Sequence, residues 1–343
     1  MTDELLKEGA QTRPPEEPKG EPTFKDRFNE TLEKTWAFLK TQKGWLWMIP
    51  ALICLAIFTF WPIINTVISA FRNGYNPIAA EQQDAGIGFD NFVTAVKDTY
   101  FLNCLFNTFM FTLIAVPLST IIALLVSVAL SSIKKLQSFY QSLFFLPYLT
   151  NAMAIGAVFY AMFQVVGPVK TDTGAWTAES WGLLNTIFGM QVQWVNINAD
   201  AWAMRFVVIF YEVWSGLPFK ILILFSALQN VNKQYYDAAK IDGAKKTTVL
   251  WRVTVPLISP MISYLLITGF IGGFKAYSAV VGIFGASMGP NNDYEMGTIV
   301  GLIYRYIETN QTGVAAAASL ILFGIIMIFT AINLYVSKKR VHY

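Results

Sequence analysis

Charged residues, histidine and cysteine are all scarce in this sequence. Aspartate, glutamate, lysine and arginine make up 14% of its 343 residues, whereas a soluble domain usually carries about a quarter. The net charge of +3 is small and spread along the chain, which argues against nucleic acid as a partner. The chain has one histidine, His342, which is too few for a typical metal site. Its two cysteines, Cys54 and Cys104, lie in or beside apolar runs and do not suggest a disulfide framework. We therefore expect no metal and no cofactor in this chain itself.

Long apolar stretches take the place of the missing charge. Hydrophobic residues make up 55% of the chain and its mean hydropathy is +0.46, which indicates an integral membrane protein. Each stretch exceeds the length of about 20 residues that a helix needs to cross the hydrocarbon layer. Backbone groups in lipid must be satisfied within their own segment, so these stretches are expected to be helices. The predicted fold is all-α, with six transmembrane helices at Leu46–Phe71, Thr108–Leu130, Phe139–Val165, Met204–Leu228, Leu257–Gly285 and Thr312–Val336.

Lysine and arginine are distributed unevenly between the two sides that these spans define. If the N-terminus is cytoplasmic, the inner segments hold 18 of the 25 lysines and arginines. Because positive residues favour the cytoplasmic side, both termini and the segment between the fourth and fifth spans are predicted to lie in the cytoplasm.

The first 44 residues are predicted to form a cytoplasmic tail that precedes a six-span domain of residues 45–343. The tail begins with charged and proline-rich sequence, TRPPEEPKGEP, and has no early apolar core of the kind found in a cleavable signal peptide. Large apolar residues recur in it at helical spacing, which favours an amphipathic helix on the inner membrane surface over a docking element. They are Phe24, Phe28, Leu32, Trp36 and Leu39.

The cytoplasmic segment 235–260, YYDAAKIDGAKKTTVLWRVTVPLISP, is polar although it joins two spans. The Asp242-Gly243 pair predicts a break between two short helices, because glycine readily takes the left-handed conformation that ends a helix. Pro256 and Pro260 then mark the entry to the fifth span. Small residues at the break would let another surface approach closely. We favour a docking elbow over an ordinary positive loop that only sets topology.

The same segment resembles the EAA loop of ABC importer permeases. The resemblance rests on Asp237-Ala238-Ala239, Asp242-Gly243-Ala244 and the ending Val255-Pro256-Leu257-Ile258-Ser259-Pro260, with Asp237 where glutamate is usual. In that family the loop forms a coupling helix seated in a groove of the ATP-hydrolysing subunit, and the core is a type I (MetI-like) permease fold. The resemblance implies a coupling set of Asp237, Ala238, Ala239, Asp242, Gly243, Ala244 and Pro256.

Other stretches resemble the carbohydrate branch of these permeases. They are LFFLPYLTNAMAIGAVFYAMF, WGLLNTIFG, VWSGLPFKILILFSALQNV and the tail NLYVSKKRVHY, while GASMGP matches the glycine-rich external run of the branch only weakly. The resemblance implies a subunit of a bacterial cell-membrane importer that translocates a sugar in oligosaccharide form. Its expected partners are a second homologous permease, two ATPase subunits, an extracytoplasmic sugar-binding protein and membrane lipid.

Enzymatic motifs are missing from the sequence. The run that begins at Gly243 lacks the first glycine and the spacing of a phosphate-binding GxxxxGK[ST] loop. No nucleophile–base pair or carboxylate dyad reads as catalytic. We therefore expect a transport subunit with no catalytic residues, driven by ATP hydrolysis on a separate chain.

Polar and helix-breaking residues at membrane depth indicate where a substrate could pass. Gly216 and Pro218 should kink the fourth span, and Lys275 at mid-membrane needs a partner or water, for which Glu212 is a candidate. The predicted pathway set is Glu212, Trp214, Ser215, Gly216, Phe219, Phe274, Lys275, Tyr277 and Ser278. A purely structural Glu212–Lys275 pair with packed aromatic rings is the equally weighted alternative.

Similarity to maltose-type permeases implies sugar contacts in two spans. They fall on Ser215, Gly216 and Phe219 in the fourth span and on Phe274, Lys275 and Ser278 in the fifth. Lys275 and Ser278 replace amide side chains of that relative, so an anionic sugar or glycerol phosphate is an alternative substrate. In another class, an ion-driven secondary transporter would use Glu212 and Lys275 for proton coupling and would need no elbow. A membrane scaffold would leave the polar residues at depth unexplained.

Overall fold

The structure is a computed structural model that describes Glu33 and residues 43–76, 86–133, 135, 137–167, 182–291 and 294–340. The chain divides into two units, Met1–Asn65 and Thr66–Tyr343. Of the predicted amphipathic helix at residues 24–39, only Glu33 is described. Among the described residues no strand occurs, apart from one bridge between Arg72 and Ile87.

The first predicted span is an unbroken helical run. It comprises α2 (Lys43–Leu55), the π-turn η1 (Ala56–Phe60) and α3 (Trp61–Phe71). Residues Trp47–Phe71 are long and apolar enough to cross a membrane, and the most apolar stretch of this run buries none of its residues inside the chain.

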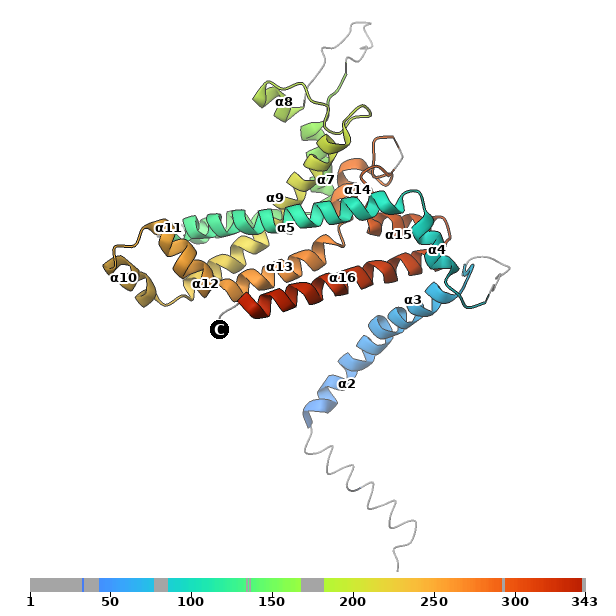
Figure 1. The fold of residues 1–343 in the computed structure, drawn as a ribbon, viewed down its shortest axis with the longest axis horizontal. Coiled ribbons are helices and arrows are strands. Elements are labelled where there is room, and N and C mark those ends of the chain that lie inside the picture. Colours follow the sequence, from blue (N-terminus) through green and yellow to red (C-terminus); the bar gives the residue numbers. More distant parts are fainter. Residues whose placement is uncertain are drawn as a thin grey trace, which may run out of the picture. The chain divides into compact units, whose positions relative to one another are not determined.

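Three long helices form the frame of the second unit. They are α5 (Phe101–Ser132), α9 (Ala201–Gln229) and α16 (Thr312–Arg340), and each also qualifies as a membrane span. Helix α5 packs along α9, and α13 (Ser259–Gly273) lies against α5, α9 and α16 (Figure 1). Proline inside α5, at Pro117, removes one backbone donor. Hydroxyl groups nearby bond to the carbonyls one turn earlier, as Thr120 does to Val116 at 2.7 Å.

The third predicted span, Phe139–Val165, is wrong as one continuous helix. The chain forms α6 (Gln137–Phe145), the 3-10 turn η2 (Leu146–Leu149) and α7 (Ala152–Phe163), and the two halves meet at 93°. Pro147 lies in the turn, and Asn151 caps α7 by accepting hydrogen bonds from Met153 N at 2.9 Å and Ala154 N at 3.3 Å. The cap starts a new helix in a new direction.

The fifth predicted span, Leu257–Gly285, also needs correction. Residues before it form α11 (Lys246–Val249), the π-turn η3 (Leu250–Thr254) and α12 (Val255–Leu257), which meet α13 at 70°. Helix α13 ends at Gly273, and α14 (Ser278–Phe284) is a separate helix that packs on α7. The described residues nevertheless give four unbroken candidates and two bent ones, up to six spans if each bent pair counts as one, and the all-α, six-span prediction is confirmed.

Shorter helices lie at the two ends of this frame. At one end α10 (Lys233–Ile241) and α11 lie beyond the end of α9, while α4 (Asp90–Lys97) and α15 (Ile299–Glu308) lie at the opposite end (Figure 1). Helix α8 (Leu183–Phe188) extends beyond α7. The polar elbow and the outer helices are thus separated by the length of α5.

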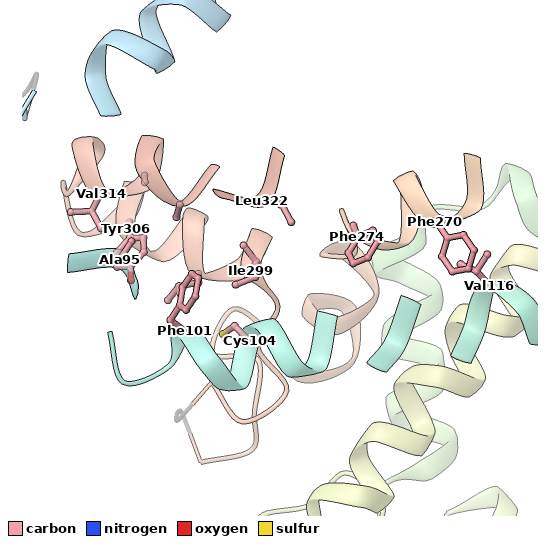
Figure 2. Packing of buried hydrophobic residues seen from close by; sticks show 13 residues of the cluster. Ala95, Phe101, Cys104, Val116, Phe270, Phe274, Ile299, Tyr306, Val314 and Leu322 are labelled. Carbon is pink, nitrogen blue, oxygen red and sulfur yellow. The ribbon is translucent and has the colours of Figure 1, made fainter. Parts of the chain in front are cut away.

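Buried apolar side chains run along α5. One cluster extends from Phe101, Cys104 and Ile299 past Phe274 to Phe270 and Val116 (Figure 2). It joins α5 to α13, α15 and α16. Because lipid is as apolar as these side chains, close packing rather than escape from water holds such helices together.

Candidate functional site

The elbow between α9 and α13 consists of α10, the turn at residues 242–245 and α11. Asn232 caps α10 by accepting from Gln234 N at 3.0 Å. The helix ends in a turn in which Ala244 N donates to Ala239 O at 3.0 Å and Gly243 takes a φ of +66°. The predicted break at Asp242-Gly243 is therefore where the chain turns.

The coupling set divides into exposed and buried members. Asp237, Ala238, Asp242, Gly243 and Pro256 are exposed, and Ala244 is half-buried. Ala239 is only 8% exposed, so its small side chain lets α10 pack on its own chain and adds no area to the outer surface of the elbow.

Sequence reasoning missed an apolar residue on the elbow. Ile241 is 87% exposed at the end of α10, and Tyr235 is also exposed. An isoleucine among charged residues in a segment outside the membrane was the available signal. Exposed apolar side chains at such a place are typical of a surface that another protein covers.

Two cavities lie between the helices that the elbow connects. The smaller, called here the Lys220 cavity, has a volume of about 140 Å³ and lies between α5, α9 and α13. The larger, called here the Lys275 cavity, has a volume of about 330 Å³ and is bounded by η2, α7, α9 and the break after α13. Glu212, Ser215, Gly272 and Ala276 line both.

Lys220 joins α9 to α5 in the smaller cavity. It is 7% exposed, and its ammonium donates to Val116 O at 3.0 Å and to the Ser119 hydroxyl. The Ser119 hydroxyl in turn donates to Ala115 O at 2.6 Å. The charge is thus held on backbone and hydroxyl oxygens beside the proline of α5.

Most of the predicted pathway residues meet in the Lys275 cavity. Glu212, Trp214, Ser215, Lys275, Tyr277 and Ser278 all line it. Tyr148 of η2 is a further wall that sequence reasoning did not single out. The cavity therefore presents aromatic faces beside hydroxyl groups and two opposite charges.

Three predicted residues lie elsewhere. Phe274 is 1% exposed and packs edge-on against Phe109 and Phe329, each at 5.1 Å between ring centroids, so it is a core residue. Phe219 lines neither cavity and stacks on Tyr148 at 5.9 Å. Gly216 borders the Lys220 cavity alone.

Glu212 and Lys275 do not form the ion pair suggested by the sequence. No pair within 4.0 Å joins them, although both residues are described. The cation that shares a cavity lining and a helix with Glu212 is Lys220, two turns further along α9. Both lie on one helix in adjoining cavity walls, whereas Lys275 follows a break in the chain that the sequence did not indicate.

No group of three or more metal-ligating side chains occurs among the described residues. What the described site does combine is a water-accessible cavity at membrane depth and an exposed elbow on the helices that wall it. These features are typical of a membrane transport subunit.

Comparison with known proteins gives the family. Residues 92–342 match the model of the binding-protein-dependent transport system inner membrane component, and the chain belongs to that family. Membership confirms the resemblance to ABC importer permeases and a multi-pass location in the membrane.

Relatives align over most of their lengths. A probable ABC transporter permease protein of Mycoplasma pneumoniae is 27% identical over 82% of this chain and 81% of its own. The arabinooligosaccharides transport system permease protein AraP of Halalkalibacterium halodurans is 28% identical over 89% and 91%. The sn-glycerol-3-phosphate transport system permease protein UgpA of Escherichia coli is 26% identical over 87% and 95%.

Solved structures share the fold. A chain of a bacterial ABC transporter involved in the import of the acidic polysaccharide alginate superposes with a TM-score of 0.67 at 21% identity. The match covers 89% of this chain and 99% of that one. At this identity the match establishes the overall fold and nothing about the ligand.

Proposed function

We propose that this chain is one permease subunit of an ATP-driven importer, which carries a sugar into the cytoplasm of a bacterium. ATP is hydrolysed with its magnesium ion on two copies of a separate ATPase subunit. A second, homologous permease completes the path, and an extracytoplasmic binding protein delivers the sugar. Both termini and the elbow face the cytoplasm.

The exposed elbow is the observation that carries the proposal. It connects α9 to α13 through α11, η3 and α12, and these two helices supply walls of both cavities. A force applied to the elbow by an ATPase that changes shape would reach the cavity walls through helices rather than loops. Alternating access needs such a rigid connection.

The orientation is supported by the charge of the elbow end. Lys233, Lys240, Lys245, Lys246 and Arg252 all lie on or beside the elbow, which makes it the richest cluster of positive charge among the described residues. Helices α5 and α16 end on the same side (Figure 1). The positive-inside rule places that side in the cytoplasm.

The chemistry of the larger cavity supports a sugar. Tyr148, Trp214 and Tyr277 offer faces for the C–H surfaces of a sugar ring, and Ser215 and Ser278 offer hydroxyls for its oxygens. Relatives that carry arabinooligosaccharides or sn-glycerol 3-phosphate favour an oligosaccharide first and a phosphorylated polyol second.

A glycine substitution tests the docking role of the elbow. Gly243→Asp places a side chain where no atom of this chain lies within 4 Å, so it should disturb a partner more than the fold. Gly189→Asp is the matched control, because Gly189 has a similar φ of +64° and the same open space at the other end of the molecule.

The measurements are ATP-driven uptake by the complete transporter and recovery of the ATPase with the permease in mild detergent. We expect Gly243→Asp to lower both at least about tenfold, equivalent to about 1.4 kcal/mol, while Gly189→Asp inserts and retains the ATPase. Equal retention by both variants contradicts the proposal. Uptake by the permease alone in liposomes, driven by an ion gradient, would identify a secondary transporter instead.

A further inference from the structure

The two cavities contain three charged side chains, of which two are positive. Glu212 lines both cavities, Lys220 only the smaller one and Lys275 only the larger one. Every other residue in either lining is apolar or uncharged. The linings of the two cavities together therefore carry one positive charge in excess.

Glu212 and Lys220 line the same cavity on one helix. Lys220 is nearly enclosed by protein at membrane depth, where an ammonium without a compensating charge is costly. Its neutral partners, Val116 O and Ser119, satisfy hydrogen bonds but supply no negative charge. Glu212, two turns earlier on α9, is the acidic residue in the lining of that cavity.

Lys275 is left without such a partner. Its side chain is exposed, and no hydrogen bond or ion pair joins it to any described residue. It lies in a cavity of about 330 Å³, within the size range of small-molecule sites. A positive charge in a low-dielectric recess attracts anions more strongly than the same charge in open water.

We propose that the Lys275 cavity binds the anionic group, carboxylate or phosphate, of a negatively charged sugar or polyol. The inference deepens the proposed function and rests on it. The ammonium of Lys275 pairs with the anion, the hydroxyls of Ser215 and Ser278 bond to neighbouring oxygens, and Tyr148 and Trp214 cover the carbon faces. Lys275 is available for the anion because no ion pair joins it to Glu212, the acidic residue of the same cavity.

The sign of the potential in the cavity can be measured without knowing the substrate. In a chain with Cys54→Ser and Cys104→Ala, which removes both native thiols, Ser278→Cys places one thiol on the cavity wall. Its rate of modification is measured with a sulfonate-bearing and a trimethylammonium-bearing methanethiosulfonate in vesicles containing the full transporter. The ratio of the two rates is divided by the ratio for a small free thiol in solution.

We expect the sulfonate reagent to be favoured at least about fivefold. Lys275→Gln should abolish this preference and Lys275→Arg should keep it. Ser287→Cys is the matched control, because Ser287 is also half-buried and lines a cavity without charged residues between α7 and the loop after α14. A preference for the cationic reagent, a ratio unmoved by Lys275→Gln, or no reaction at Ser278→Cys overturns the proposal.

Protection of the Ser278→Cys thiol separates the two sources of anion. A trisaccharide of galacturonate supplies carboxylates, sn-glycerol 3-phosphate supplies a phosphate, and a trisaccharide of glucose is the neutral comparison. The proposal is supported if either anion slows modification of the thiol and if Lys275→Gln abolishes this protection. The anion that protects then identifies the bound group as a carboxylate or a phosphate. Protection by the neutral sugar alone or by none of the three contradicts it.

These outcomes are distinguishable from failure of the proposed function. Thiol modification needs neither ATP nor a docked ATPase. An inverted rate ratio beside normal ATP-driven uptake would reject only the anionic substrate. Normal uptake and ATPase recovery in Gly243→Asp would reject the importer assignment, whatever the rate ratio.

Discussion

Gly156 of α7 and Gly282 of α14 pack backbone against backbone. A Cβ atom added at Gly156 would lie 2.5 Å from Gly282 Cα, and one added at Gly282 would lie 3.0 Å from Gly156 Cα. Both distances are too short for a side chain. This crossing fixes α14 on α7, so the wall that carries Ser278 moves together with the helix that follows the bend at Asn151.

Gly282→Leu should therefore destabilise the folded chain. Forcing side-chain carbons into a filled contact costs about 1–3 kcal/mol, and more where backbone must separate. The midpoint of thermal unfolding in detergent is the measurement. Gly324→Leu in α16 is the matched control, since no atom lies within 4 Å of a Cβ added there. Equal midpoints in the two variants would show that the crossing tolerates separation.

The Glu212–Lys220 interaction predicts a coupling energy that Glu212 and Lys275 should lack. Removing one charge of a buried pair leaves the other uncompensated, whereas removing both restores neutrality. We expect Glu212→Gln and Lys220→Met to show a coupling of about 1–3 kcal/mol in a double-mutant cycle of the free energy of unfolding. The cycle of Glu212→Gln with Lys275→Met should give a coupling energy near zero. A larger coupling energy for Glu212 with Lys275 than for Glu212 with Lys220 would contradict the pairing of Glu212 with Lys220.

Apolar periodicity and charge placement were enough to predict the class of protein and the number of spans. They did not reveal where the third and fifth predicted spans are interrupted, because Asn151 and the break at residues 274–277 lie within stretches that remain apolar on both sides. Composition over a window of about 20 residues reports whether a segment can enter lipid. It does not report the direction in which the segment continues.

The candidate site was predicted only in part, because sequence composition does not report the direction of the chain after a break. Glu212, Trp214 and Ser215 line one cavity because a single helix, α9, fixes their relation to each other. Lys275 was assigned to Glu212 from opposite charge alone, although the identity of its neighbours depends on the turn that follows α13. Phe274, beside Lys275 in sequence, points into the core because that turn sends successive side chains in different directions.

Ile241 is expected to be covered by the ATPase in the assembled transporter. Ile241→Ser removes apolar surface from the exposed end of α10 and should weaken docking by about 1–2 kcal/mol, which corresponds to roughly five- to thirtyfold in affinity. Binding of purified permease to its ATPase is the measurement. Ile241→Leu keeps the apolar surface and should bind like the natural chain. Unchanged affinity in the serine variant would mean that Ile241 stays exposed in the complex.

Asn107 should matter far more to stability than its neighbour Asn103. The Asn107 amide is fully buried; it donates to Glu295 O at 2.9 Å and Gly297 O at 3.1 Å and accepts from Arg205 Nε at 3.0 Å. It thereby ties α5 to α9 and to the loop before α15. Asn103 is half-buried and donates only to carbonyls of that loop.

Asn107→Leu removes the partner of the buried Arg205 Nε donor and of the Gly297 carbonyl, and each unsatisfied buried group costs about 1–3 kcal/mol. We therefore expect Asn107→Leu to lower the unfolding midpoint in detergent by several times the change caused by Asn103→Leu, in which water can replace the amide. Arg205→Lys in the Asn107→Leu background should recover part of the loss, because an ammonium on a flexible stem can turn toward the freed Gly297 carbonyl. Equal unfolding midpoints for the two leucine variants would show that apolar packing, and not the hydrogen bonds of the Asn107 amide, stabilises the contact between these helices.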